Sequence, residues 1–188
     1  ACPGSQQAME DDRPAAERAE LVRQAQAGDR RAFAHLAHRH GRAVYAIALA
    51  HLGRAADAED VAQASLLAAL EHLDDCRDPA RFDAWLFAIA RNRARRALLR
   101  RRLRDVLPRI TPEPPDPAGA PLPEARMQLL RALAGLPARA REVVLLHDLE
   151  RYSHAEIAAA LGVSEESSRQ HLSRARRALR AHLEEKPP

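Results

Sequence analysis

The stretch SHAEIAAALGVSEESSRQHLSRARRAL, residues 153–179, decides the fold of the C-terminal half of the chain. Ser153 is a favourable N-cap for one short helix and Ser164 for a second. Gly162 stands between the two helices, where a tight turn needs a left-handed backbone, and Ala158 is small enough for them to cross closely. The spacing predicts a helix-turn-helix, with a helical hairpin of solvated arginines as the plainer alternative.

The second helix of this motif carries side chains suited to reading DNA. The apolar positions expected to face inward are Ile157, Leu161, Val163 and Leu172. Arginine can bond a guanine edge through two hydrogen bonds, and arginines further along the helix suit phosphates. The candidate readers are Ser167, Arg169, Gln170, His171, Arg174, Arg176 and Arg177. Ser168 lies where such helices bury Val or Ile, so we expect weak packing under the reader helix.

A proline-rich stretch, PRITPEPPDPAGAPLP at residues 108–123, divides the chain. Its prolines exclude a helix interior or a central strand and favour a stiff, extended tether. Helical patterns lie on both sides, so we expect an all-α protein with two small helical domains. The expected division is a disordered N-terminus with a remnant before Met9 (1–14), a helical domain (15–105), a Pro-rich linker (106–123) and a helix-turn-helix domain (124–186).

Helix signals place the elements within this division. In the first half, the expected helices cover about 17–27, 29–52, 57–73 and 81–104. In the second half, they cover about 123–136, 137–149, 154–161 and 165–183. Gly53 is a plausible C-cap, Asp57 a plausible N-cap, and Pro137 suits a first helical turn.

The composition permits nucleic-acid binding and excludes several other classes of protein. The 188 residues carry a formal net charge of +4, with only 3% aromatic residues. Nearly every cation is Arg, whose fork binds phosphate in a way that Lys cannot. Cys2 and Cys76 are far apart, which excludes a cysteine-built zinc site. No signal peptide or membrane-spanning run is visible, so we expect a cytoplasmic protein without membrane insertion, metal or cofactor.

The stretch RFDAWLFAIARNRARRALLRRRLRD, residues 81–105, begins as a core helix and ends wrapped in arginine. Without an acid among them, these arginines repel one another unless a polyanion is near; the alternative is a solvated or fraying tail. A ring, an amide and a guanidinium fall nearly in line at i, i+7 and i+11, which suits splayed single-stranded bases. Trp85 taken alone fits a core position better than a base contact, so Asn92 is the better candidate for a base contact. The candidate residues are Trp85, Arg91, Asn92, Arg95 and Arg96.

The stretch DAEDVAQASLLAAL, residues 57–70, has more apolar residues than one buried stripe needs. The expected core stripe is Ala58, Ala62, Leu66, Ala69 and Leu73. A second sector mixes acids, an amide and leucines, namely Glu59, Asp60, Gln63, Leu67 and Leu70. This sector suits a basic protein partner, because leucines supply buried area and acids supply steering. Spacing alone leaves open that the two leucines contact a helix of the same domain.

Taken together, these segments resemble a bacterial RNA-polymerase sigma factor of the extracytoplasmic-function (ECF) class. The resemblance covers nearly the whole chain after Met9. The motifs that carry it, in order, are GDRRAFAHLAHRH, DAEDVAQ, RFDAWLFAIARNRARR, LAGLPARAREVVLLHDLERYSHAEIAAALGVS and LSRARRAL. Departures lie in the reader helix, at Glu166-Ser167-Ser168 and Arg169-Gln170-His171, and after DAEDVAQ, at Ala64 and Ser65.

The resemblance implies partners and a division of labour. Core RNA polymerase would bind the DAEDVAQ helix through Asp57, Glu59, Asp60, Gln63 and Leu67. The helix that carries Trp85, Asn92 and Arg96 would capture and melt the minus-ten promoter element, and the helix-turn-helix would read the minus-thirty-five element. An anti-sigma protein is a further implied partner. The resemblance implies no small-molecule substrate.

Three other classes of protein compete with this interpretation. A stand-alone helix-turn-helix regulator would bind duplex DNA as a dimer. A sigma mimic that sequesters an anti-sigma protein would not need the arginine-wrapped helix. An enzyme is disfavoured because no nucleophile-base pair, phosphate loop or metal spacing is visible, and His35, His38 and His40 fit a solvated helix face better than a metal site.

Overall fold

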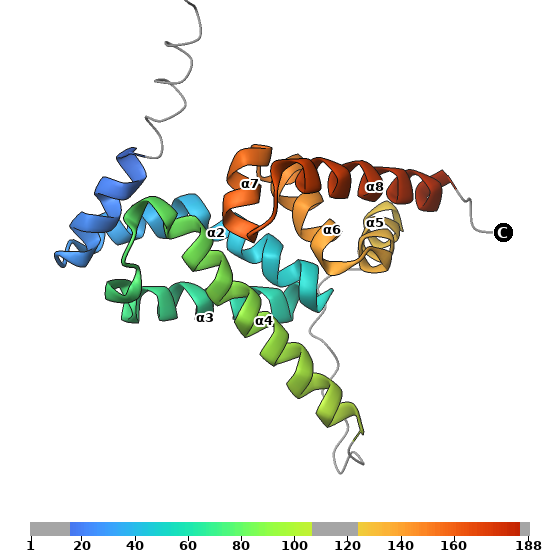
Figure 1. The fold of residues 1–188 in the computed structure, drawn as a ribbon. Coiled ribbons are helices and arrows are strands. Elements are labelled where there is room, and N and C mark those ends of the chain that lie inside the picture. The colour runs from blue at the N-terminus through green and yellow to red at the C-terminus, as the bar shows by residue number, and fades with distance from the viewer. Residues whose placement is uncertain (1–15, 107–123, 185–188) are drawn as a thin grey trace, which may run out of the picture.

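The computed structural model describes residues 16–106 and 124–184, and it is built from helices throughout these ranges (Figure 1). No strand occurs among the described residues, which confirms the all-α prediction. The predictions for residues 1–14 and for nearly all of the linker lie outside the described residues. None of the described helices is both long enough and apolar enough to cross a membrane.

The first domain is a bundle whose helices follow local signals. Asp29 accepts hydrogen bonds from the backbone N–H groups of Arg31 and Ala32 at the start of α2, and Gly53 ends that helix with a φ of 70°. The elements are a helix at 16–26, α2 (Arg30–Leu52), α3 (Ala55–Glu71), the 3-10 turns η1 (Leu73–Asp75) and η2 (Pro79–Arg81), and α4 (Phe82–Val106). The predicted helices therefore exist close to their expected bounds.

Alanines on α2 let the three long helices approach closely. Four of them are almost completely buried: Ala43, Ala46, Ala48 and Ala50. Phe82 and Leu86 of α4 pack into the same core, as expected, while Ile89 is only partly buried. The predicted stripe of α3 is likewise confirmed, since Ala58, Ala62 and Ala69 are buried. Small residues at the crossings replace the aromatic residues that this composition lacks.

Two expectations for the first domain are wrong. Asp57 is not an N-cap, because α3 already begins at Ala55 after Arg54. His40 is not on a solvated face, since its ring is buried and lies 5.6 Å from that of Phe82 between centroids. Periodicity could not show this, because the burial of His40 depends on a helix from another part of the chain.

The second domain contains the predicted helix-turn-helix. Ser153 and Glu156 form a capping box at the start of α7, and Gly162 ends α7 with a φ of 66°. The elements are α5 (Glu124–Gly135), α6 (Ala138–Val144), the π-helical turn η3 (Leu145–Leu149), α7 (His154–Leu161) and α8 (Glu165–Glu184). Pro137 is the N-cap of α6 rather than its first residue, and η3 replaces the end of the single helix expected there.

The two domains pack against each other, with α6 and η3 on α2 and with α7 on α4 (Figure 1). His51 of α2 lies 2.8 Å from the Oε1 atom of Glu142 in α6, and both side chains are largely buried. His40 is hydrogen-bonded to the hydroxyl of Tyr152 at 3.0 Å. Arg141 donates to the carbonyl of Ala50. These contacts make one compact body of the described residues.

Candidate nucleic-acid interface

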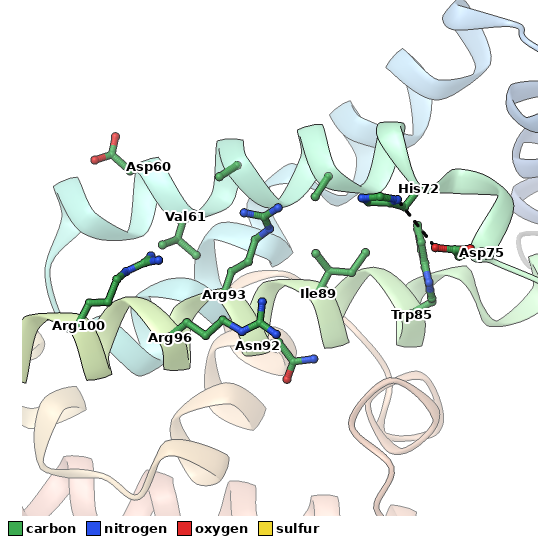
Figure 2. Close-up of a pocket in the computed structure, with 12 residues that line it drawn as sticks. Asp60, Val61, His72, Asp75, Trp85, Ile89, Asn92, Arg93, Arg96 and Arg100 are labelled. Carbon is green, nitrogen blue, oxygen red and sulfur yellow. Dashed lines mark ion pairs between the residues drawn. The ribbon is translucent and has the colours of Figure 1, made fainter.

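A groove of about 560 Å³ runs between α3 and α4 (Figure 2). Most of its polar lining comes from α4, through Trp85, Asn92, Arg93, Arg96 and Arg100. The four polar residues follow Trp85 by seven, eight, eleven and fifteen positions, which at about 100° per residue keeps them within about 80° of its side of the helix. The regular geometry of α4 thus aligns a ring, an amide and three guanidinium groups along one wall.

The groove offers both a stacking surface and unpaired positive charge. Trp85 is half-buried against Phe82, with ring centroids 5.9 Å apart, so its indole is held in place while one part stays accessible. Figure 2 shows Arg93 and Arg100 extending from α4 toward α3. Within the described ranges, no acid lies within ion-pair distance of Arg93, Arg96 or Arg100. A phosphate backbone would satisfy these cations, and aromatic and amide groups would contact bases.

The structure brings together three of the five α4 residues proposed from the sequence. Trp85, Asn92 and Arg96 line the groove. Arg95 is exposed but does not line it. Arg91 faces the second domain and donates to the carbonyl of Ala160 at 3.4 Å, and its partial burial lowers the pKa of its guanidinium.

Sequence reasoning missed two cationic residues of the groove, Arg93 and Arg100. The signal was available, because they lie eight residues after Trp85 and four residues after Arg96. It was hidden because arginines surround this part of the helix, and the period alone does not show which of them face α3.

The outward face of α3 exposes two leucines to solvent. Leu67 is 61% exposed and Leu70 is 46% exposed. The alternative in which these leucines contact another helix of the same domain is therefore wrong. Glu59, Asp60 and Gln63 are exposed on this helix as well, and Asp60 lies at the border where this face meets the groove, whose lining it joins. An apolar pair flanked by acids is left open to a partner.

Asp57 differs from the other residues proposed for this face. Its Oδ2 atom accepts a hydrogen bond from Arg101 of α4 at 3.3 Å and lies 3.9 Å from Arg54. The side chain is only partly exposed. Asp57 therefore ties the start of α3 to α4.

A second groove of about 660 Å³ follows α8 in the helix-turn-helix domain. Its lining includes four arginines on one helical stripe, Arg169, Arg176, Arg177 and Arg180. The first three were proposed from the sequence and Arg180 was not, although its spacing places it on the same stripe. The other proposed readers, Ser167, Gln170, His171 and Arg174, lie on α8 but outside this groove.

Acids near the start of α8 moderate its positive charge. Arg169 lies 3.3 Å from Glu165 and 3.6 Å from Glu166, and Gln170 donates to Glu166 at 3.1 Å. These exposed pairs exchange readily with solvent and ligand, because surface ion pairs contribute little free energy. Arg174 and Arg177 are exposed and have no such acid partner among the described residues.

The described residues offer no site for a metal ion, since they contain no group of three histidine, cysteine or acidic side chains placed to hold one. The free thiol of Cys76 is buried. Burial raises its pKa to about 11, which keeps it protonated and unreactive near neutral pH. The guanidinium, amide and indole groups that line the two grooves are of the kinds that contact phosphates and bases.

Comparison with known families identifies the class of this protein. The family model for Sigma-70 region 2 matches residues 36–104, and the model for Sigma-70, region 4 matches residues 126–179. RNA polymerase sigma factor NccH of Alcaligenes xylosoxydans xylosoxydans is 33% identical over 175 residues, which cover 87% of this chain and 93% of that protein. ECF RNA polymerase sigma factor SigL of Mycobacterium tuberculosis is 38% identical over 155 residues, covering 78% and 85%.

Solved structures agree with the sequence matches. CnrH, in complex with the cytosolic domain of CnrY, has 31% identity and a TM-score of 0.65, covering 90% of this chain and 99% of that one. The sigma factor RpoE from Bartonella quintana, in complex with the anti-sigma factor NepR, has 25% identity and a TM-score of 0.59, covering 82% and 98%.

The chain therefore belongs to the sigma-70 family, as an RNA polymerase sigma factor of the ECF class. It binds core RNA polymerase, recognises promoter elements and directs transcription initiation. The alternative of a stand-alone helix-turn-helix regulator is not favoured. Sigma factors are not a family of enzymes.

Proposed function

We propose that the groove between α3 and α4 captures unpaired bases of the minus-ten element. The observation that carries this proposal is the arrangement of Trp85, Asn92 and Arg96 on one wall of the groove. The indole offers a face for stacking, the amide offers both a donor and an acceptor for a base edge, and the guanidinium offers a contact for phosphate. Arg93 and Arg100 extend the positive wall along the strand.

Capture of bases accounts for melting without covalent chemistry. A base that leaves the stack loses its stacking and pairing free energy, and contacts in the groove replace part of it. Binding to the single strand therefore shifts the equilibrium toward open DNA, and polymerase carries out the polymerisation. In this proposal Arg91 and Arg95 assist from neighbouring faces of α4, with Arg91 released from Ala160 when DNA is bound.

The exposed face of α3 is the surface that we propose for core polymerase. Glu59, Asp60 and Gln63 steer a basic partner, and Leu67 supplies buried area when that partner covers it. Asp57 contributes through its hold on Arg101, which keeps α3 and α4 in register.

The stripe of arginines along α8 supports reading of the minus-thirty-five duplex. Ser167, Arg169, Gln170 and His171 lie in the first turns of α8, where a recognition helix meets base edges. The cations further along the helix are placed for phosphates, namely Arg174, Arg176 and Arg177.

The same proposal covers the domain boundaries and the remaining partner. Residues 15–105 would act on the minus-ten element, residues 124–186 on the minus-thirty-five element, and residues 106–123 would link them. The structural relatives are complexes with CnrY and with the anti-sigma factor NepR, which supports an anti-sigma protein as a partner of this chain. A protein that acts on chromosomal promoters works in the cytoplasm, where we place this chain.

The groove is tested by promoter melting with reconstituted holoenzyme. Asn92→Ala and Arg96→Ala together should lower the fraction of open complex about tenfold, because the first removes a contact with an unpaired base and the second a contact with the phosphate of the captured strand. Permanganate reactivity of thymines in the minus-ten element measures this fraction, and binding to core polymerase should not change.

A matched control is Arg31→Ala, which removes one exposed cation from the first turn of α2, away from the groove. It should leave melting unaltered. Equal melting by the double variant and the wild-type protein would exclude the groove as the site of base capture.

A further inference from the structure

The reader helix α8 is held at two points by side chains from η3 and α7. We call His147, Asp148 and His154 the histidine clamp. His154, the first residue of α7, is hydrogen-bonded through Nδ1 to the Oγ atom of Ser168 at 2.9 Å. Asp148 accepts hydrogen bonds from the Nε and Nη2 atoms of Arg176, at 3.1 Å and 2.5 Å.

Stacking of the two imidazole rings joins these two points. The ring centroids of His147 and His154 are 4.6 Å apart, with an interplanar angle of 29°. The Nδ1 atom of His147 is 2.9 Å from the Oδ1 atom of Asp148. Hydrogen bonds from Arg176 hold the pKa of the Asp148 carboxyl below its usual range, so this anchor stays ionised. A continuous chain of contacts thus runs from Ser168 to Arg176.

The buried serine is the unexpected part of this arrangement. Ser168 is 0% exposed, at a position where the sequence led us to expect weak packing. An apolar side chain there would bury area but would not prefer one rotation of the helix closely over another. A hydroxyl has a directional bond and becomes an unsatisfied buried group if the helix turns away from His154.

The two anchor points control rotation about the axis of α8. Ser168 and Arg176 lie eight residues apart, which is about 12 Å along an α-helix. A helix fixed at two such points can neither roll nor slide freely. His154 and Arg176 also line the same groove as Arg169, so the clamp adjoins the reading surface directly.

We propose that the histidine clamp sets the rotation of α8 and thereby the base preference at the minus-thirty-five element, with His154 and Ser168 as positioning residues. This inference rests on the proposed role of α8 as the reader. Hydrogen bonds to base edges weaken steeply when donors leave the plane of the acceptor, so a small roll removes discrimination between bases. Contacts with phosphate tolerate the same roll, because charge attraction has little directional preference.

The experiment uses full-length holoenzyme and two promoter libraries, one randomised at the minus-thirty-five element and one at the minus-ten element. Sequencing of the transcripts gives a base preference at each position. Ser168→Ala and His154→Leu should each reduce the ratio of best to worst base at the minus-thirty-five positions at least about threefold. The minus-ten profile serves as an internal reference and should not change.

Two further variants separate positioning from simple stability. His154→Asn keeps a polar group near the place of Nδ1 and should restore most of the minus-thirty-five preference. His182→Leu removes an exposed histidine near the end of α8 and should behave as wild type. Melting temperatures of all variants are measured alongside.

The outcomes distinguish the clamp from the function on which it rests. A minus-thirty-five profile that is unchanged in Ser168→Ala and His154→Leu would overturn the clamp. So would an equal loss of both profiles that follows the melting temperature, because it would show a purely structural role. If the wild-type protein produced no promoter-dependent transcripts, the proposed function itself would fail.

Discussion

Arginine side chains on α4 lie in different surroundings according to the face of the helix that they occupy. Arg91 and Arg96 are five residues apart, which places them on well-separated faces of the helix. Arg91 is partly buried and donates to Ala160, whereas Arg96 is exposed and lines the groove. Two residues of the same type in one run of charge therefore have different environments. The residue type identified both arginines as candidates, and the packing of the second domain determined that only Arg96 is exposed.

His40 is a buried, neutral histidine at the contact between the domains. Burial, with help from the positive charges of Arg18 and Arg39, lowers its pKa from 6.5 to about 3. Its Nδ1 atom is hydrogen-bonded to Tyr152, and its Nε2 atom lies 3.4 Å from Asp83. In the unfolded chain, the same ring regains an ordinary pKa and takes up a proton as the pH falls.

This difference predicts that His40 makes the folded protein sensitive to acid, while its neighbour Asp83 acts in the opposite direction. Because the folded pKa is lower than the unfolded one, His40 costs no stability above pH 6.5 and lowers the free energy of unfolding below it. The loss from His40 accumulates as the pH falls from 6.5 toward 3, and the raised pKa of Asp83, about 6, offsets part of it below pH 6, because the folded protein then binds this carboxyl proton more tightly than the unfolded chain does. His40→Gln should remove this contribution. Urea unfolding of both proteins at pH 7.5 and pH 5 measures it, and equal slopes with pH would contradict the prediction.

At the scale of elements, α3 combines two surfaces on one helix. Its inner stripe of alanines packs on α2 and α4, while its outer face exposes acids and leucines. Substitutions at exposed surface positions change stability little, so the outer residues can be replaced without unfolding the bundle. Function and folding can therefore be tested separately on this helix.

Reversing charge on the outer face of α3 should impair polymerase binding selectively. Asp60→Arg with Gln63→Arg should weaken binding to core enzyme at least about tenfold, since like charges then face a basic partner. Both positions are exposed, so the melting temperature should stay within about 2 °C of wild type. Co-purification and a binding titration give the result. Glu17→Arg with Gln24→Arg, at exposed positions of the helix at 16–26, makes the same change of charge and is the matched control. An equal effect of both pairs would argue against a specific docking face.

At the scale of the whole molecule, the contact between the domains limits what the chain can bind at once. The two promoter elements are roughly 25 base pairs apart, or about 85 Å at 3.4 Å per pair. A compact chain of this length has a radius of gyration of only about 16 Å. The two domains must therefore separate before both elements can be bound simultaneously.

Glu142 is the residue through which this separation can be tested. It is 2% exposed and lies 2.8 Å from His51 of the first domain and 2.9 Å from Arg139 of its own helix. Glu142→Ala should weaken the contact between the domains, because it leaves a buried histidine without its partner. Small-angle scattering should show a radius of gyration larger by several ångström. Glu71→Ala, which removes an exposed acid, should leave the radius unchanged, and a compact Glu142→Ala protein would refute the role of this contact.

Most elements of the fold were predictable because their signals are local. Asp29, Ser153 and Gly162 act on backbone groups within four residues, so the sequence shows where helices begin and end. Asp57 was wrongly predicted as an N-cap because its residue type favours that position, whereas the helix already begins at Ala55. The π-helical turn η3 could not be predicted, since the residues of 137–149 are compatible with one uninterrupted helix.

The residues of the candidate sites were likewise predictable from the sequence only in part. Asn92 and Arg96 were recognisable from their spacing along one helix, and the exposed sector of α3 from its composition. Arg93 and Arg100 were not singled out, because arginines occupy every face of this part of the helix. Only the position of α3 shows that these two line the groove. Ser168 appeared to be a weakness until His154, fourteen residues earlier, was found to bond it.

The sequence by itself determined the helices, the helix-turn-helix, the two-domain division and the family of this protein, because caps, periodicity and motif order are properties of neighbouring residues. Only the tertiary structure decided which arginines face the groove, that His40 is buried, and that Ser168 is satisfied by a histidine. The physical reason is that burial and hydrogen-bond partners depend on how helices far apart in the chain rotate and pack against each other, and no local pattern encodes that rotation.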